Sequence, residues 1–262
     1  MLTSTFIHAP GVGPATERDL WSKGIRNWSD SINAGPELLI SKAKRTAIVN
    51  TAEASVAALT AGNVAWFADA LPKREHWRSV SHFGERIGYL DIETDGGMDG
   101  GAITLIGLGD GHDVSFYVKG QNLEQFASDM LQFDSFVTFF GTGFDVPMLI
   151  RRFPSLKREF DCRFHIDLCP LLRRIGYRGG LKKIETALGI RRVPEAEGLD
   201  GMDAVRLWHV WMRGAHGSEE AMEQLLAYNK EDVVNMQALL KFAVPKLMTD
   251  AGMEHTDLEL VI

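Results

Sequence analysis

Residues 88–94 read GYLDIET, an apolar run that carries two acids at alternate positions. A short run of apolar and β-branched residues of this kind predicts a β-strand. Successive side chains of a strand point to opposite faces of the sheet, so Asp91 and Glu93 should lie on the same face. The stretch therefore predicts a pair of carboxylates that project together from one strand.

Two further acidic signatures follow in chain order. Asp145 comes directly after Phe144 at the start of a helical pattern, and Tyr228 and Asp232 lie four residues apart in a long helical pattern. Residues four apart on a helix share one face. Clusters of oxygen ligands suit Mg²⁺ or Mn²⁺ better than zinc. The three signatures together predict a two-metal phosphodiesterase.

The runs around these signatures predict an α/β fold. Three strands are expected at 86–92, 102–108 and 114–118, with Gly/Asp turns between them, and two more at 135–140 and 164–166. Helices are expected at 123–131, 146–153, 168–175, 181–188, 203–212 and 219–247. Antiparallel strands followed by crossovers and a helical half indicate a mixed sheet.

The first part of the chain has a helical pattern. A helix is expected at 16–21, two more within 41–67 with a break near Asn50, and a connector at 71–77. Gly11 and Gly13 form a turn before the first helix, where backbone N–H groups could hold a phosphate. The turn resembles half of a helix-hairpin-helix module, which grips the nucleic-acid backbone. A purely structural turn is the alternative.

Composition and charge limit the classes of function. The composition is ordinary for a globular protein, and no apolar run approaches the roughly 18 residues of a membrane span. No secretion signal is recognised, and Cys162 and Cys169 are too few for a disulfide framework, so we expect reduced thiols and a cytoplasmic location. The net charge of −7 disfavours a uniformly positive surface. Residues 151–192, however, hold twelve basic and four acidic residues, which could line a groove for a nucleic-acid backbone or form a solvated helix face.

The acidic signatures carry a family resemblance. Asp-x-Glu, Phe-Asp-x-Pro and Tyr-x-x-x-Asp resemble the three exonuclease motifs of the DEDD superfamily, and Ala227 rather than histidine before Tyr228 resembles its tyrosine branch. Residues 181–190, 198–205 and 228–234 further resemble the YprB-type ribonuclease-H-like domain. The likeness covers roughly residues 84–246.

This resemblance implies a ribonuclease-H-like fold with a mixed central β-sheet flanked by helices, and removal of nucleotides from a 3′ end with two divalent metal ions. Asp91 should then bridge both ions, Glu93 and Asp232 should complete the site of the attacking water, and Asp145 should support the second ion. Tyr228 should stay neutral and orient that water. The partner would be DNA or RNA with a single-stranded 3′ end.

The resemblance also divides the chain. We expect a helical N-terminal region over 1–82, the exonuclease domain over 83–248 and a C-terminal tail over 249–262. A structure-specific endonuclease with the same centre is one alternative, and a nucleic-acid-binding module without cleavage is another. Retention of the whole acidic set disfavours the second.

Contacts with the substrate are predicted less directly. Phe140 stands where related exonucleases often have asparagine, and it could stack on a base or be buried in the sheet. Nucleic-acid contacts are also expected from Gly141, Thr142, Lys182 and Lys183. Asp167 is expected to cap the following helix, with a role near the site as the alternative, and Trp208 and Trp211 are expected to pack in the interior.

Overall fold

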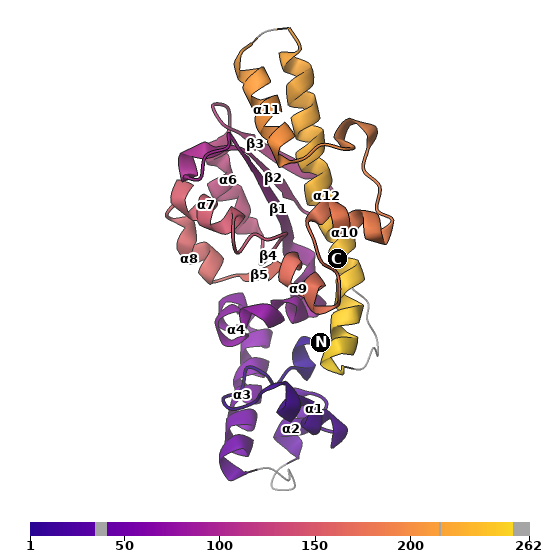
Figure 1. The fold of residues 1–262 in the computed structure, drawn as a ribbon. Helices are drawn as coiled ribbons and strands as arrows, with labels where there is room; N and C mark the ends of the chain where they lie inside the picture. Colours follow the sequence, from indigo (N-terminus) through magenta and orange to yellow (C-terminus); the bar gives the residue numbers. More distant parts are fainter. Residues whose placement is uncertain (35–40, 215, 254–262) are drawn as a thin grey trace.

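The computed structural model describes residues 1–34, 41–214 and 216–253. At its centre is a five-stranded sheet of strand order β3-β2-β1-β4-β5 (Figure 1). The strands are β1 (Ile87–Thr94), β2 (Ile103–Gly109), β3 (Val114–Val118), β4 (Ser135–Thr138) and β5 (Phe164–Asp167). β1, β2 and β3 form an antiparallel meander, and β4 and β5 run parallel to β1. The predicted mixed sheet is confirmed.

Alternation along β1 separates two hydrophobic cores. Ile87 and Tyr89 belong to a core formed with α9 (Leu168–Arg174), α10 (Leu181–Leu188) and α12 (Ser218–Ala251). Leu90 and Ile92 belong to the core on the other face, which is covered by α6 (Phe126–Asp129), α7 (Asp145–Arg152) and α8 (Leu156–Asp161). Asp91 and Glu93 share the parity of Tyr89, so they lie on the face of the sheet that α12 covers.

The predicted elements are confirmed with few changes of boundary. The fourth strand ends at Thr138 rather than 140 because Phe140 has a φ of 66°, which is incompatible with an extended strand. The helix expected at 123–131 is a series of short turns, η6 (Leu123–Gln125), α6 and η7 (Met130–Gln132). α8 was not predicted. α11 (Gly201–Met212) packs against the first part of α12. Trp208 is buried in the core there and Trp211 is packed against it, which confirms the predicted packing; their ring centroids lie 4.9 Å apart.

The N-terminal helices are α1 (Pro14–Ser22), α2 (Trp28–Asn33), α3 (Lys42–Thr60) and α4 (Val64–Ala70). The expected break near Asn50 is wrong. The alanine-rich segment continues through the exposed Asn50 as one helix, because its many strong helix formers outweigh the low propensity of one asparagine. The break lies instead at residues 61–63, where the Asn63 side chain caps α4.

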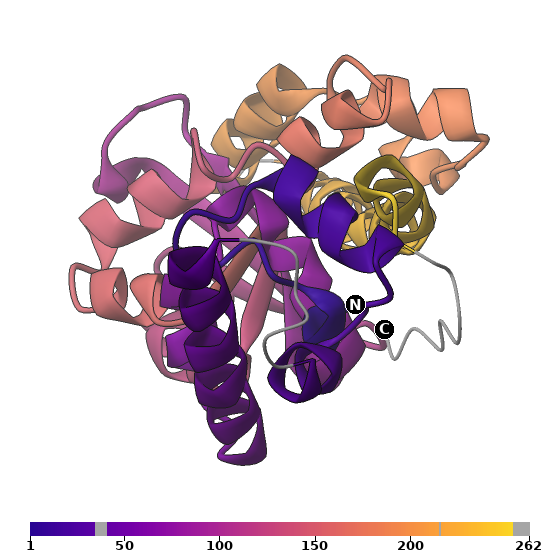
Figure 2. The same ribbon diagram turned by 90° about the horizontal axis from the view of Figure 1, so that it is seen from below.

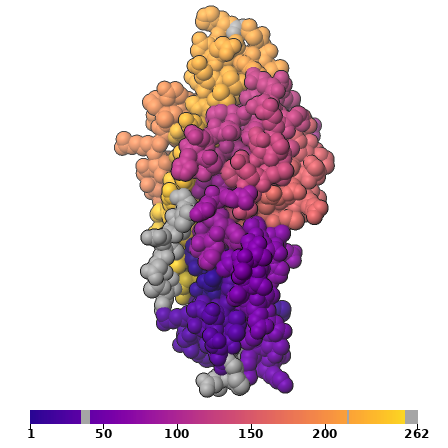
Figure 3. Space-filling view, turned by 180° about the vertical axis from the view of Figure 1, so that it is seen from behind, coloured from indigo at the N-terminus to yellow at the C-terminus, as the bar shows by residue number. Residues whose placement is uncertain are grey.

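Most of the expected connector, residues 71–77, belongs to a 3₁₀ helix, η3 (Lys73–Ser79), of which residues 75–79 are buried. Trp77 is fully buried, and the hydrophobic core of the N-terminal helices includes Phe164 of β5. Figure 2 shows these helices lying across the end of the sheet and of α12, and Figure 3 shows that they form one end of an elongated molecule. Residues 254–262 of the predicted tail lie outside the described residues. Within the described ranges, no helix is both long and apolar enough to span a bilayer.

Two histidines join η3 to the edge strand β5. The backbone N–H of His165 donates to Nδ1 of His76 over 3.0 Å, and Nε2 of His76 lies 3.2 and 3.3 Å from the carbonyl oxygens of Ala68 and Leu71. These distances require a neutral His76 with its proton on Nε2. Burial lowers the pKa of both histidines to about 4 from the ordinary value of 6.5.

The lowered pKa values of these two histidines predict a loss of stability in mild acid. Below pH 6.5 the unfolded chain takes up protons that the folded protein does not accept until about pH 4. The contribution of these histidines to the free energy of unfolding is therefore fully present above pH 6.5 and is lost as the pH falls from 6.5 to about 4. His76→Gln removes one titrating group, so the free energy of unfolding should fall by about 2 kcal/mol less than in wild type between pH 6.5 and 4.5. Urea unfolding at several pH values measures this, and a slope in His76→Gln equal to that of wild type would contradict the assignment.

A buried ionic network also holds the N-terminal helices to the rest. Arg78 donates through Nη1 to both oxygens of Glu17, at 2.9 and 3.0 Å, and through Nε to Glu75 at 2.7 Å. All three side chains are at most 3% exposed. Glu17 also accepts from the backbone N–H groups of residues 6 and 7. Glu75 pairs with Arg174 of α9 at 3.1 Å, so the network connects α1, η3 and α9.

Candidate active site

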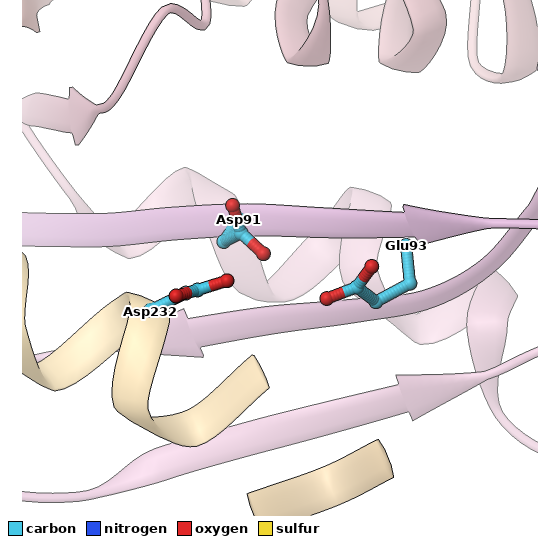
Figure 4. Close-up of side chains that lie close together, drawn as sticks. All are labelled: Asp91, Glu93 and Asp232. Atoms are coloured by element: carbon cyan, nitrogen blue, oxygen red, sulfur yellow. The ribbon is translucent and has the colours of Figure 1, made fainter. Parts of the chain in front are cut away.

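Three carboxylates meet between β1 and α12. One oxygen each of Asp91, Glu93 and Asp232 lies within 4.8 Å of the others, and Figure 4 shows the three side chains directed toward a common point. The strand contributes the first two because they are two residues apart, and the helix contributes the third. One carboxylate oxygen of Glu93, Oε1, is buried without a hydrogen-bond partner among the described residues.

Close approach of α12 to the sheet completes this cluster. Gly107 of β2 lies directly opposite Asp91 in the antiparallel register. A Cβ at Gly107 would stand 2.0 Å from Oδ1 of Asn229 and 2.9 Å from Val233, so only glycine admits the helix here. Asn229 donates through Nδ2 to Asp91 over 2.8 Å. Because Asn229 and Asp232 are three apart on α12, the contact that positions one also positions the other.

Asp145 lies beside the cluster at the start of α7. Its Oδ1 accepts a hydrogen bond of 3.2 Å from the backbone N–H of Ile92, the residue between the two strand carboxylates. The side chain is buried, and burial raises its pKa to about 7. The structure thus brings Asp145 next to the three clustered carboxylates without placing it among them.

Tyr228 shares the face of α12 with Asp232, as predicted. Its hydroxyl oxygen accepts a hydrogen bond of 2.7 Å from Nζ of Lys182, which comes from α10. Burial, and then the negative charge of Asp232 and its neighbours, raises the pKa of Tyr228, so the phenol is neutral at physiological pH.

The cluster holds more negative charge than its surroundings neutralise. Burial raises the pKa of Asp91 and of Glu93, and the nearby carboxylates raise both further. Burial also raises the pKa of Asp232, while the adjacent Arg192 opposes that rise. Divalent cations would relieve this repulsion. The all-oxygen donor set and the unpartnered Glu93 oxygen fit such ions.

The loop between β4 and α7 holds the predicted substrate residues together. Asp167 accepts from the backbone N–H of Phe140 at 2.8 Å and of Thr142 at 3.0 Å, and also caps α9 through Cys169 N at 3.1 Å. The predicted helix cap is confirmed, and Asp167 also fixes the backbone of the loop that leads into Asp145; a functional role near the site stays a prediction. Phe140 is 55% exposed, so the alternative that buries it in the sheet is wrong. Its positive φ turns the side chain away from the strand.

The glycines of this loop make room for the chain itself. A Cβ on Gly141 would stand 2.2 Å from Oγ1 of Thr138, and one on Gly143 would stand 2.6 Å from the ring of Phe140. These close contacts are made by side chains of the chain itself, and a nucleic-acid contact at Gly141 stays a prediction. Gly143 in particular lets the far end of the aromatic ring of Phe140 approach the backbone.

The other predicted contacts are not gathered at the cluster. Lys183 is exposed, and Gly11 and Gly13 precede α1 with no atom within 4 Å of a Cβ at either position, so phosphate binding there stays a prediction. The basic segment 151–192 is partly neutralised. The members that form ion pairs are Arg152, Lys157, Arg163, Arg174 and Arg192.

Four residues at the site were not predicted from the sequence to belong to it. They are Gly107, Asn229, Glu185 and Arg192. A signal existed for Asn229, because it lies three residues before Asp232 and thus on the same helical face. Gly107, within an otherwise apolar strand, carried the general signal of a close backbone approach. Glu185 pairs with Arg192. An irregular segment leads to Arg192, so no periodic pattern in the sequence predicts this pair.

The first strand of the mixed sheet carries two carboxylates, and α12 brings a third to meet them. This arrangement defines a class of α/β domain built around an acidic centre. The family model of the RNase H superfamily matches residues 88–244, which is more than half of the chain. The chain therefore belongs to the RNase H superfamily, and its fold is ribonuclease-H-like. This membership suggests a nuclease that processes nucleic acid by hydrolysing phosphodiester bonds, with which the acidic cluster is compatible. No curated protein and no solved structure matches the chain.

Proposed function

We propose that the protein is a 3′–5′ exonuclease that hydrolyses phosphodiester bonds of nucleic acid with two divalent cations, Mg²⁺ or Mn²⁺. The observation that carries the proposal is the convergence of Asp91, Glu93 and Asp232 within 4.8 Å in a chain of the RNase H superfamily. The resemblance of the three motifs to the tyrosine branch of the DEDD exonucleases supports the direction of digestion.

Each acidic residue has a role in this proposal. Asp91 would hold both cations, Glu93 and Asp232 would hold the one beside the attacking water, and Asp145 would support the other. When bound, two divalent cations would supply activation of the water and stabilisation of the leaving oxygen of the phosphodiester. The hydrogen bond from Ile92 N fixes the orientation of Asp145 beside the strand carboxylates.

Tyr228 would orient the attacking water. Its oxygen already accepts a hydrogen bond from Lys182, so its own O–H proton remains available for donation. A neutral phenol can donate in this way, and the raised pKa of Tyr228 keeps it neutral. Lys182 therefore acts here by positioning Tyr228, in addition to the nucleic-acid contact predicted for it.

The proposal is tested by digestion of nucleic acids labelled at the 5′ end. Single- and double-stranded DNA and RNA are incubated with the protein and Mg²⁺, Mn²⁺ or EDTA. A ladder that shortens from the 3′ end and disappears in EDTA is expected. Cleavage of a circular single strand would favour the endonuclease instead. Binding without metal-dependent cleavage of any substrate would favour the binding module.

We also propose that Phe140 stacks on a base near the 3′ end of the substrate. The ring is exposed on the loop that leads into Asp145, and Asp167 fixes the backbone of that loop. Stacking of a base on an aromatic side chain contributes about 1–3 kcal/mol. Phe140→Ala should therefore raise KM for a single-stranded substrate by about tenfold and change kcat much less.

Two variants control this measurement. Phe140→Tyr keeps an aromatic face and should restore the wild-type KM. Met98→Ala removes another exposed apolar side chain, which is 67% exposed, and should leave KM unchanged. Since Phe140 is outside the core, the melting temperature should stay within experimental error, and an unchanged KM in Phe140→Ala would refute the stacking role.

A further inference from the structure

Arg192 reaches into the acidic site from an irregular segment. It lies between α10 and the 3₁₀ turn η8 (Pro194–Ala196), in a stretch without helix or strand. Despite this position its side chain is only 7% exposed. Its Nη2 pairs with Oδ1 of Asp232, one of the three clustered carboxylates.

The same guanidinium has a second and stronger attachment. Nε and Nη2 of Arg192 each donate to one oxygen of Glu185 over 2.7 Å, which is a bidentate pair. Glu185 is 2% exposed on α10 and also accepts from Nδ2 of Asn235 at 3.1 Å. Glu185 is not a member of the acidic cluster. Arg192 therefore has one partner outside the cluster, held by two hydrogen bonds, and one partner inside it, held by a single contact.

The contact inside the cluster competes with any divalent cation. Arg192 supplies positive charge to Asp232, a carboxylate that the proposed function needs for metal binding. An arginine remains charged at all physiological pH values, so it cannot leave by losing its proton. It can only be displaced. Its Nη1 is buried without a partner among the described residues, so this nitrogen can donate to a further acceptor after Arg192 is displaced from Asp232.

We propose that Arg192 is the built-in counter-cation of the acidic site. It pairs with Asp232 in the metal-free protein. When a divalent cation binds Asp232, Arg192 is displaced from this carboxylate and stays paired with Glu185 beside the cluster. This inference rests on the proposed function, because it assumes that Asp232 holds a metal ion. Arg192 is in this sense a positioning residue, which neutralises Asp232 before the metal binds and thereby lowers the affinity for the metal.

The test is the affinity of the intact protein for Mn²⁺, measured by titration calorimetry and by the electron paramagnetic resonance signal of free Mn²⁺, without nucleic acid. Arg192→Gln removes the competing charge, so Mn²⁺ should bind about tenfold more tightly. Arg191→Gln changes an exposed neighbour on the same segment and should leave the affinity unchanged. A residue with a purely structural role would have the opposite effect, since its loss would loosen the site and weaken binding.

A second variant guards against a failure to fold. Arg192→Gln leaves Glu185 buried without its cation, whereas Glu185→Gln/Arg192→Gln removes both charges and keeps the amide contact with Asn235. Both variants should bind Mn²⁺ more tightly than wild type. Unchanged or weaker binding in the folded double variant would overturn the inference. If wild type binds no Mn²⁺, or if Asp91→Asn does not abolish its Mn²⁺ binding, the metal centre of the proposed function is refuted instead.

Discussion

Asp91→Asn should abolish nuclease activity while leaving the fold intact. Asp91 is the carboxylate on which the proposed site depends most, since it would contact both cations. Asparagine has the same shape, and its side-chain oxygen can still accept from Asn229, so the packing of α12 against β2 should survive. Loss of one charge from the ligand set should lower kcat/KM by at least about a thousandfold, which corresponds to about 4 kcal/mol of lost transition-state stabilisation.

The measurement is the rate of release of nucleotides from an end-labelled strand at saturating Mg²⁺ and Mn²⁺. Asp69→Asn, which neutralises an exposed carboxylate on α4, is the matched control and should keep the wild-type rate. The circular dichroism spectrum of Asp91→Asn should match that of wild type. Retention of more than a tenth of the activity would show that the acidic cluster is not the active site.

Arg78→Met should produce the largest loss of stability of any single change considered. The substitution keeps much of the side-chain volume but leaves Glu17 buried without a cation, while Glu75 keeps Arg174 and the more distant Arg74. Breaking a buried ion pair on one side costs about 3–5 kcal/mol, because the remaining charge is left without compensation. The midpoint of urea unfolding should fall accordingly.

Two comparisons make this result specific to burial. Lys157→Met breaks an ion pair in which the lysine is 68% exposed, and it should leave the free energy of unfolding nearly unchanged. Glu17→Gln/Arg78→Met removes the stranded charge as well and should recover part of the loss. If Arg78→Met were as stable as Lys157→Met, the network could not be what holds α1 to η3 and α9.

The parts of the fold that were predicted from the sequence are those encoded locally. The alternation in residues 88–94 is a property of seven neighbouring residues, and the structure confirms both the strand and the shared face of Asp91 and Glu93. The break expected near Asn50 was wrong because one weak helix former does not interrupt an alanine-rich helix. Burial of η3 was not predicted either, because it depends on contacts with β5 that are distant in sequence.

The same distinction applies to the site. The spacing of Tyr228 and Asp232 placed them on one helical face, but nothing local specified how closely that face approaches the sheet. Gly107 decides this, and its effect depends on the register between β1 and β2. The exposure of Phe140 likewise follows from a backbone conformation that few non-glycine residues adopt, so the two alternatives could not be separated from sequence.

The contact between Asn229 and Asp91 joins residues 138 positions apart. A contact of such long range forms late, because closure of the intervening chain must be offset by interactions made elsewhere. During synthesis β1 emerges well before the part of α12 that carries Asp232, so the nascent chain displays only the strand carboxylates. The cluster is complete only when nearly the whole domain has been made and folded. The proposed hydrolytic activity would thus require the chain as far as Asp232, because a protein shortened before that residue lacks the third carboxylate of the cluster.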